Sequence, residues 1–251
     1  MKKVFCFILI LAAIIAMPAV SSFAEGGVNW YVRRCGNQKP DIPKEHLAAM
    51  DAGAYYVGEG EEKVIYLTFD AGYENGNVEK CVDILKDKGV SGAFFVLKHI
   101  LCKNSDLIKK MYDNGNLICN HTTNHCDMSA MSSDEIISNV LSLEKLCLER
   151  CGVEMSKFFR FPEGRYSTDA INAVAKAGYK TVFWSFGYAD WDNHRQPSAE
   201  SAYDLIIKNT HPGEVILLHP TSETNVKILP QLIDAWRDMG YRFGTLDELC
   251  V

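Results

Sequence analysis

Seven short apolar runs alternate with helical stretches along most of this 251-residue chain. The expected strands are rich in branched and aromatic residues and lie near residues 64–69, 92–97, 117–119, 158–161, 181–185, 215–218 and 241–245. The expected helices lie near 77–88, 105–114, 132–151, 168–177, 199–209 and 224–239. Such alternation indicates βα units and a parallel sheet. We predict an α/β fold, a distorted (β/α) barrel of about seven parallel strands. A flat doubly wound sheet is the alternative, but it usually carries a glycine-rich phosphate loop, which this sequence lacks.

The overall charge limits the class of partner. The formal net charge is −6, with 47% hydrophobic and 23% charged residues, which are ordinary values for a globular protein. An acidic chain of this kind does not suggest a nucleic-acid or anionic-membrane partner. A neutral or polar substrate fits this balance better, and we expect a monomer.

The N-terminus has the pattern of a secretory signal. Lys2 and Lys3 precede an apolar run from 4 to 17, which small residues follow up to Ala24. The run is shorter than the ~20 apolar residues that a membrane-spanning helix needs. We therefore predict a signal peptide at 1–24, an N-terminal extension at 25–60 that lies across the domain, and a catalytic domain at 61–251. An uncleaved membrane anchor is the alternative reading of the apolar run.

Ionisable residues follow five of the seven expected strands. Active sites of (β/α) barrels lie at the C-terminal ends of the strands, so these residues are expected to share one rim. They are Asp70, the pair His121 and His125, Arg160, Asp190 and His219. The sequence therefore predicts an active site at this end of the barrel.

The two histidines are the first candidates for metal binding. On a helical turn, residues four apart have Cβ atoms ~6 Å apart, so two imidazoles can converge on one ion. Cys119, Cys126 and Asp127 are further candidate ligands by proximity. A pair of histidines on a solvated loop is the alternative.

The other four residues each have more than one interpretation. Asp70 could cap a helix or act as a general base, and His219 could be a core histidine. Arg160 and Asp190 could form a plain ion pair. Taken together with the histidine pair, however, they have the parts for metal-assisted hydrolysis: a base, an ion and an acid.

Five segments in order resemble the motifs of the polysaccharide deacetylase family, also called NodB-type or carbohydrate esterase family 4. They are TFDAGYENG (68–76), NHTTNH (120–125), RFPEG (160–164), ADW (189–191) and ILLH (216–219). The resemblance covers about residues 62–250. It implies a distorted barrel of seven strands whose members remove acetyl groups from cell-wall sugars, usually with a divalent metal.

The resemblance also implies roles for individual residues. Asp70 is the implied catalytic base, and His219 is the implied acid that protonates the departing amine. Arg160 is expected to hold Asp70 in place, with Asp190 bonded in turn to Arg160.

The implied cofactor is a divalent metal, expected to be zinc, held by His121 and His125. A backbone N–H near Glu163 is expected to stabilise the oxyanion together with the metal. The residues expected to contact the substrate are Glu163, Gly164, Trp184, Trp191 and Leu217.

One position departs from the family pattern. The family normally has a second acid directly after the base as the third metal ligand, and this chain has Ala71. Two imidazoles alone give a weaker site, unless Glu74 or Asn75 reaches in from the following loop.

Three features of the sequence are similar to one branch of the family. They are the loss of this acid before GYENG, the tract HPGEVILLHPTSETN (211–225) and the early GGVNWYVRR. This branch is the delta-lactam-biosynthetic de-N-acetylases of sporulation. It implies N-deacetylation of N-acetylmuramic acid in peptide-stripped peptidoglycan, leading to muramic δ-lactam in spore cortex. The implied location is outside the cell, in the cell wall or cortex space. At Glu163 this chain has an acid where relatives often have Tyr or Arg.

Two other functions remain open at this stage. A general peptidoglycan or chitooligosaccharide deacetylase would act on N-acetylglucosamine, but it would be expected to keep the complete metal triad. A non-catalytic glycan-binding protein on the same fold has no need for both a base and an acid.

Overall fold

A computed structural model describes residues 27–250, and the predicted signal peptide at 1–24 lies outside the described residues. Eight strands form one curled parallel sheet: seven lie in the order β7-β5-β4-β3-β2-β9-β8, and β10 pairs with the start of β2. These strands are β2 (Val64–Ala71), β3 (Ala93–Val96), β4 (Leu117–Asn120), β5 (Phe158–Phe159), β7 (Lys180–Thr181), β8 (Phe186–Gly187), β9 (Glu214–Leu218) and β10 (Arg242–Phe243). The predicted distorted barrel is confirmed, and the flat doubly wound sheet is excluded.

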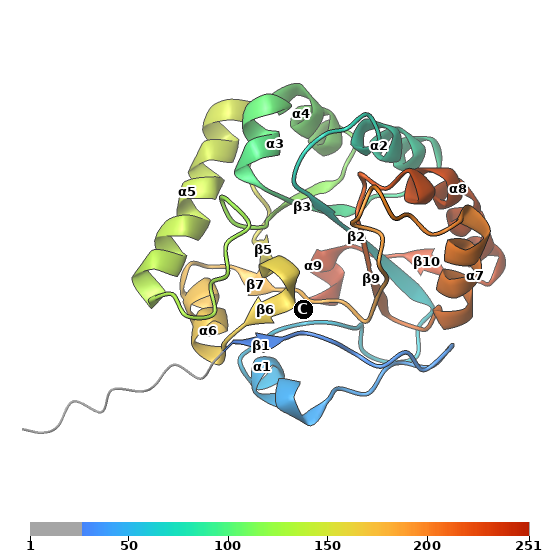
Figure 1. The fold of residues 1–251 in the computed structure, drawn as a ribbon, viewed down its shortest axis with the longest axis horizontal. Helices are drawn as coiled ribbons and strands as arrows, with labels where there is room; N and C mark the ends of the chain where they lie inside the picture. Colours follow the sequence, from blue (N-terminus) through green and yellow to red (C-terminus); the bar gives the residue numbers. More distant parts are fainter. Residues whose placement is uncertain (1–26, 251) are drawn as a thin grey trace, which may run out of the picture.

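Helices form a ring outside the strands (Figure 1). They are α2 (Val78–Asp87), α3 (Lys98–Lys103), α4 (Ser105–Asp113), α5 (Ser133–Cys151), α6 (Thr168–Lys176), α7 (Ala199–Asn209) and α8 (Glu223–Asp238). The capping box of Ser132 and Glu135 that opens α5 is present. Six of these helices were expected from periodicity. The short α3 was not, because six residues do not show a clear helical period.

Burial explains why these segments form these elements. In β2 every residue is buried except Asp70, which is half-buried, as expected for a parallel strand covered on both faces. In α2 the buried residues are Val78, Cys81, Val82 and Leu85, which recur at helical spacing and pack on the sheet. Burial of both strand faces holds the strand ends, and therefore the rim, in place.

The N-terminal extension closes the open side of the curled sheet. It contains β1 (Val28–Asn29), the 3₁₀ turn η1 (Lys44–His46) and α1 (Leu47–Asp51). Strand β1 pairs antiparallel with β6 (Arg165–Tyr166). Further on, the N–H of Tyr55 donates to Thr181 O at 2.9 Å, and the N–H of Gly58 donates to Gly213 O at 2.8 Å. The segment therefore spans from the β7 edge of the sheet to β9, across the face at the bottom of Figure 1.

This closure corrects one sequence-based expectation. Residues 181–185 are not one strand: they leave β7 and enter β8. The N–H of Val182 donates to Phe159 O, that of Phe183 to Tyr55 O, and that of Ser185 to Val215 O. Because the segment changes partner at each of these steps, its apolar run reflects burial in the barrel wall and not one continuous ladder.

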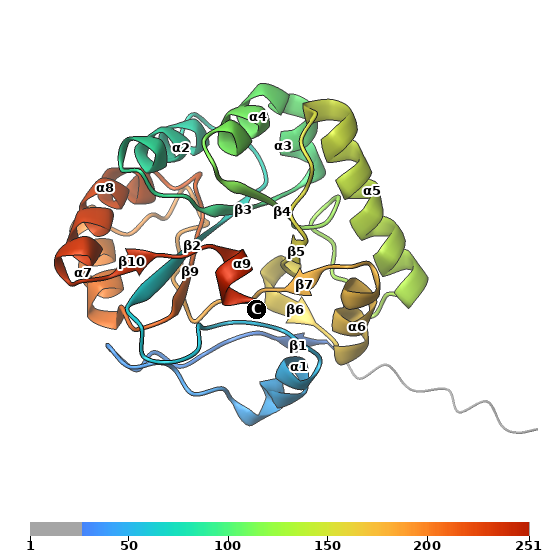
Figure 2. The ribbon, with the colours of Figure 1, turned by 180° about the vertical axis from the view of Figure 1, so that it is seen from behind.

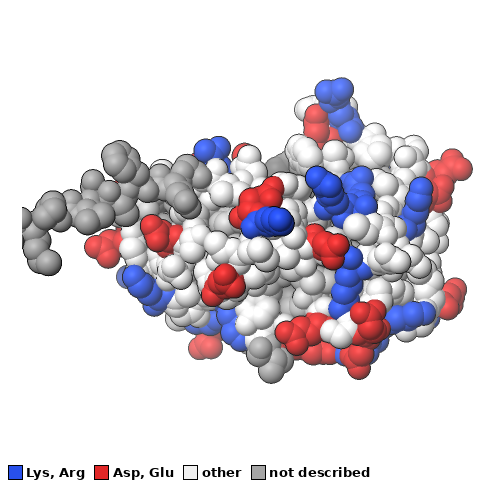
Figure 3. Space-filling view, turned by 90° about the horizontal axis from the view of Figure 1, so that it is seen from below, with Lys and Arg blue, Asp and Glu red and all other residues white. Residues whose placement is uncertain are grey.

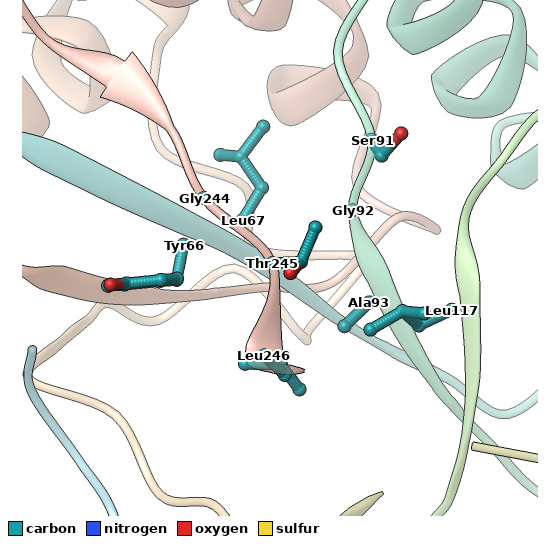
Figure 4. Close-up of a pocket in the computed structure, with 9 residues that line it drawn as sticks. All are labelled: Tyr66, Leu67, Ser91, Gly92, Ala93, Leu117, Gly244, Thr245 and Leu246. Carbon is teal, nitrogen blue, oxygen red and sulfur yellow. The ribbon is translucent and has the colours of Figure 1, made fainter. Parts of the chain in front are cut away.

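The end of the barrel opposite the rim is plugged. Helix α9 (Leu246–Leu249) lies in the middle of the ring when the molecule is seen from behind (Figure 2). Leu246 and the preceding Thr245 lie beside β2 and the starts of β3 and β4 (Figure 4). The cavity between them is about 10 Å³, which is room for one water at most. This end of the barrel therefore has no room for a substrate.

No helix within residues 27–250 is long and apolar enough to span a membrane. On the face seen from below, acidic and basic side chains are interspersed (Figure 3). The described part of that face shows no basic stripe of the kind that nucleic acids bind.

Candidate active site

A cavity of about 610 Å³ opens at the C-terminal ends of the strands. Eight of the predicted site residues line it: Asp70, His121, His125, Glu163, Trp184, Trp191, Leu217 and His219. Gly72, Tyr73, Leu97 and Thr221 line it as well. Arg160 and Asp190 are completely buried behind the cavity wall. The structure thus brings together residues that are up to about 150 positions apart in the sequence.

Asp70 lies near the end of β2, and its carboxylate is held by a buried arginine. Arg160 Nη1 donates to Asp70 Oδ1 at 2.9 Å. Burial raises the pKa of Asp70, but the neighbouring His121 and the Arg160 guanidinium outweigh it and hold this pKa below its ordinary value. Asp70 is therefore a carboxylate at neutral pH, able to accept a proton from a molecule in the cavity.

Arg160 has no freedom to turn away from Asp70. Its Nε donates to Val182 O at 3.1 Å, and its Nη2 donates to Thr68 Oγ1 at 2.9 Å and to Phe183 O at 3.2 Å. Its guanidinium also lies 4.2 Å from the centre of the Phe95 ring. The predicted contact of Arg160 with Asp70 is present. The supporting role of Thr68 was not predicted, because a strand hydroxyl has no distinctive sequence signal.

His219 follows β9, and two of its groups contact Asp190. Nδ1 lies 2.7 Å from Asp190 Oδ1, and the backbone N–H donates to Asp190 Oδ2 at 2.8 Å. Burial lowers the pKa of His219, but the hydrogen bond and charge of Asp190 outweigh burial and raise it above its ordinary value. With Nδ1 bonded to Asp190, Nε2 is the ring nitrogen available to a substrate.

The predicted contact between Asp190 and Arg160 is wrong. The two carboxylate oxygens of Asp190 are occupied by His219 and by Asn225, whose Nδ2 donates to Oδ2 at 2.6 Å. Tyr188 OH in turn donates to Asn225 Oδ1. The site therefore has two separate pairs, Arg160 with Asp70 and Asp190 with His219. Sequence reasoning missed Asn225, although it lies within the quoted tract 211–225.

The histidine pair converges, but not on a helical turn. Residues 121–132 follow β4 as a loop, and His125 has a left-handed backbone with φ of 56°. The rings of His121 and His125 are nearly perpendicular, with centroids 5.1 Å apart. The helical explanation is wrong, because the turn of the loop and not helical spacing brings the rings together.

The donor set fits a divalent ion held by two imidazoles. Because Arg160 O can only accept a hydrogen bond, His121 Nδ1 donates to it at 2.9 Å, which leaves the Nε2 lone pair free, 3.5 Å from Asp70 Oδ2. Burial lowers the pKa of His121 to about 4, so the ring is neutral, as a metal ligand must be.

No third protein ligand joins this pair within residues 27–250, where no group of three or more His, Cys, Asp or Glu side chains could hold an ion. Ala71 is buried and carries no donor. The Glu74 carboxylate accepts from the N–H of Val78 and of Glu79 at the start of α2, and Asn75 Nδ2 donates to Thr221 O. Glu74 and Asn75, the two loop residues that could have replaced the missing acid, are therefore already engaged in other hydrogen bonds.

Aromatic side chains flank the cavity. The Trp191 side chain is 61% exposed, and its ring centroid lies 6.2 Å from that of His219. Tyr73 is 44% exposed, and its OH accepts a hydrogen bond from Asn193 Nδ2 at 2.8 Å. Exposed rings of this kind offer flat apolar faces to a sugar. Tyr73 and Leu97 were not predicted.

Glu163 and Gly164 sit where the motif RFPEG turns. Both have positive φ, 56° for Glu163 and 65° for Gly164. A Cβ at Gly164 would lie 2.8 Å from Trp184 and 2.9 Å from Trp30, so Gly164 allows close packing and does not itself line the cavity. Glu163 does line the cavity, which places an acid in the site.

The C-terminal end of this barrel has a carboxylate held by an arginine, a histidine held by a carboxylate and a cavity flanked by aromatic side chains, which fits a hydrolase that acts on carbohydrates. The family model described as "Polysaccharide deacetylase" matches residues 57–182 of this chain. The chain belongs to the polysaccharide deacetylase family, and the predicted family and enzyme class are confirmed.

Individual relatives agree with this assignment. Over 98% of its length the chain is 36% identical to the peptidoglycan-N-acetylmuramic acid deacetylase PdaA of Bacillus subtilis, covering 95% of that protein. The solved structure of B. subtilis PdaA, a family 4 carbohydrate esterase, superposes with a TM-score of 0.85 over 89% of this chain and 96% of that one. A peptidoglycan-N-acetylglucosamine deacetylase of Bacillus cereus is 35% identical and covers 75% of this chain and 88% of its own length.

Proposed function

We propose that this protein hydrolyses the acetamide of N-acetylmuramic acid in peptidoglycan from which the stem peptide has been removed. The observation that carries the proposal is that Asp70 and His219 line one cavity, each oriented by its own buried partner. The freed amine can then close onto the neighbouring carboxyl as a muramic δ-lactam, as the spore-cortex branch implies.

The chain's own residues supply the proton transfers. Asp70, ionised by its environment, accepts a proton from the attacking water. Arg160 keeps the Asp70 carboxylate in one orientation. His219, protonated through its contact with Asp190, donates its proton to the leaving nitrogen. The amide C–N bond breaks, and the products are acetate and an amine.

The remaining residues bind and orient the substrate. Leu217 and Trp184 form an apolar wall for the acetyl methyl or a sugar face, and Trp191 offers an exposed ring. A backbone N–H of the turn at Glu163 is the donor proposed for the oxyanion, because the N–H of Gly164 already donates to Phe161 O at 3.0 Å. When bound at His121 and His125, a divalent ion, expected to be zinc, supplies Lewis-acid polarisation of the acetyl carbonyl.

The preference for muramic acid is supported by the extent of similarity. The match to the muramic acid deacetylase spans nearly the whole chain, while the match to the glucosamine deacetylase spans three quarters of it. The muramic acid enzyme is thus similar over a longer part of this chain. We propose that the protein acts outside the cell, in the cell wall or cortex space.

Mass spectrometry of glycan digests tests this function. The purified protein is incubated with peptide-stripped peptidoglycan and, separately, with chitooligosaccharides, each with and without a chelator. We expect acetyl loss from muramic acid only, sensitive to the chelator. Acetyl loss from glucosamine would instead assign the protein to the general deacetylases. Binding of both glycans without acetyl loss would make it a glycan-binding protein.

A further inference from the structure

A second hollow lies beside the catalytic cavity, between the N-terminal extension and the β8 edge. It measures about 500 Å³ and is lined by residues 30–34 on one side and 184–187 on the other. We call it the arginine groove, because Arg33 and Arg34 line it. None of the proton-transfer steps above uses it.

The arginine groove adjoins the catalytic cavity. Trp184 lines both hollows. Gly187, in the groove, pairs across the sheet with Leu217, in the cavity. The groove is also fixed to the RFPEG turn, because the N–H of Trp30 donates to Gly164 O at 2.8 Å and Trp30 Nε1 donates to Trp184 O at 2.9 Å. A polymeric substrate in the cavity can therefore continue into the groove.

The groove has a rigid aromatic floor. The Trp30 ring stacks on Phe183 at 4.3 Å between centroids. Arg34 Nη2 donates to Gly187 O at 2.8 Å, and its guanidinium lies 5.3 Å from the centre of the Phe186 ring. These rings are buried, so they fix the shape of the groove and leave contact with a glycan to the exposed Arg33 and Arg34.

The charges of the two hollows have opposite signs at their outer parts. The Arg33 side chain is exposed and forms no hydrogen bond or ion pair with another residue of the described 27–250, although the Arg33 backbone O accepts from Cys35 Sγ. Arg34 is also exposed, and its only hydrogen bond to a described residue is the one to Gly187 O. The catalytic cavity instead contains Glu163, whose charge repels an anion. An anionic group on the substrate is thus favoured in the groove over the part of the cavity next to Glu163, and the carboxyl of the reacting sugar is expected to point away from Glu163.

We propose that the arginine groove binds the stretch of glycan strand adjoining the deacetylated sugar, and that Arg33 and Arg34 bind a sugar carboxylate there. The proposal rests on the proposed function, because removal of the stem peptide leaves the lactyl group of muramic acid as a free carboxylate. A strand that keeps its peptides has a neutral amide at that position, which cannot form an ion pair with a guanidinium. The groove therefore selects strands on which a peptide-cleaving amidase has already acted.

Binding measurements test the groove without relying on turnover. In an Asp70→Asn background, calorimetry gives the Kd for peptide-stripped glycan and for the same glycan with its carboxyls reduced to alcohols. We expect carboxyl reduction to weaken binding about tenfold, as for the loss of a charge-assisted hydrogen bond. Arg33→Gln, with and without Arg34→Gln, is expected to weaken binding of the carboxylate glycan alone. Added salt is expected to weaken binding of the carboxylate glycan to the parent protein, and to weaken its binding to the arginine variants less.

Matched controls separate the effect of a lost charge on glycan binding from an effect on folding. Arg150→Gln removes the same charge from an exposed position at the end of α5 and is expected to leave both Kd values unchanged. Arg33→Glu adds repulsion and is expected to weaken binding further than Arg33→Gln. Because Arg34 also bonds Gly187 O, thermal melting checks that its variant folds.

Three results would contradict the proposed role of the arginine groove. They are no glycan binding by the parent protein, an equal loss of affinity for both glycans in the variants, or no loss of affinity in the Arg33 variants. Failure of the proposed function looks different, because the enzyme with Asp70 intact would release no acetate from muramic acid. Acetate release together with unchanged Kd values in the Arg33 variants would support the proposed function and contradict glycan binding in the arginine groove.

Discussion

The side chain and the backbone of His219 are both tied to one carboxylate, that of Asp190, at 2.7 Å from Nδ1 and 2.8 Å from the backbone nitrogen. Asp190 is completely buried, while the His219 side chain is 23% exposed toward the cavity. The pair therefore fixes the position of the proposed acid, its ring orientation and its protonation. This two-point contact was not expected from the sequence, which placed Asp190 against Arg160.

Asp190→Asn is expected to move the alkaline limb of the pH profile to lower pH. His219 must be protonated to act as an acid, and burial would lower its pKa if Asp190, with a smaller contribution from Asp70, did not outweigh burial and raise it. Without that charge, burial lowers this pKa, so activity is lost at a lower pH. Kinetic measurement of kcat/KM across pH checks this. An unshifted limb would show that another group sets it.

The same pair gives a matching dependence of stability on pH. A histidine whose folded pKa is raised stabilises the fold below its unfolded pKa of about 6.5, and this contribution is lost as pH rises through the folded pKa. Asp190→Asn should therefore lower Tm more at pH 5.5 than at pH 9, that is, at roughly one unit below and well above the unfolded value. Equal losses at both pH values would contradict a charged pair.

Asp70→Asn is expected to abolish turnover while leaving the fold intact. The amide cannot accept the proton from water, and general-base catalysis contributes about 10²–10⁴-fold. Because Arg160 is completely buried and loses its partner charge, we also expect Tm to fall. Acetate release and circular dichroism measure the two effects. Retained turnover would remove Asp70 as the base.

Ala71→Asp is expected to tighten metal binding. The family pattern has its third metal ligand at this position, so the new carboxyl is expected to join the two imidazoles. Loss of an outer-shell partner already costs ~10–100-fold in affinity, so a direct ligand should gain at least about tenfold. Ala71 is buried, so without metal the added charge should lower Tm, and zinc should restore it.

Ala71→Asn is the matched control, because it adds similar volume without a charge. It should show neither the gain in affinity nor a rescue of Tm by zinc. An Ala71→Asp protein with unchanged affinity in a zinc titration would show that some other group already fills the third position.

The sequence was sufficient to predict the barrel and the rim, because buried parallel strands and their helices have strong local periodicity. Asp70, His219 and the histidine pair could be found because they follow such strands directly. The partner of Asp190 could not be found this way. Asp190 lies in an irregular segment after β8, so the sequence does not determine which of several buried groups it meets. The split of 181–185 was missed for a related reason, since its partner Tyr55 comes from the extension.

Trp191→Ala is expected to raise KM with little effect on folding. The ring is 61% exposed and lies beside His219 at the mouth of the cavity, so it has little packing to lose. A stacked aromatic contributes about 0.5–1.5 kcal/mol beyond its buried area, which corresponds to roughly a 2- to 12-fold change in KM. Trp191→Phe should recover part of this, because a smaller ring still offers a flat face. Tyr112→Ala, at an exposed aromatic on α4 away from the cavity, is the control and should leave KM unchanged. If Trp191→Ala lowered kcat and left KM unchanged, the ring would act by positioning His219 and not by binding the sugar.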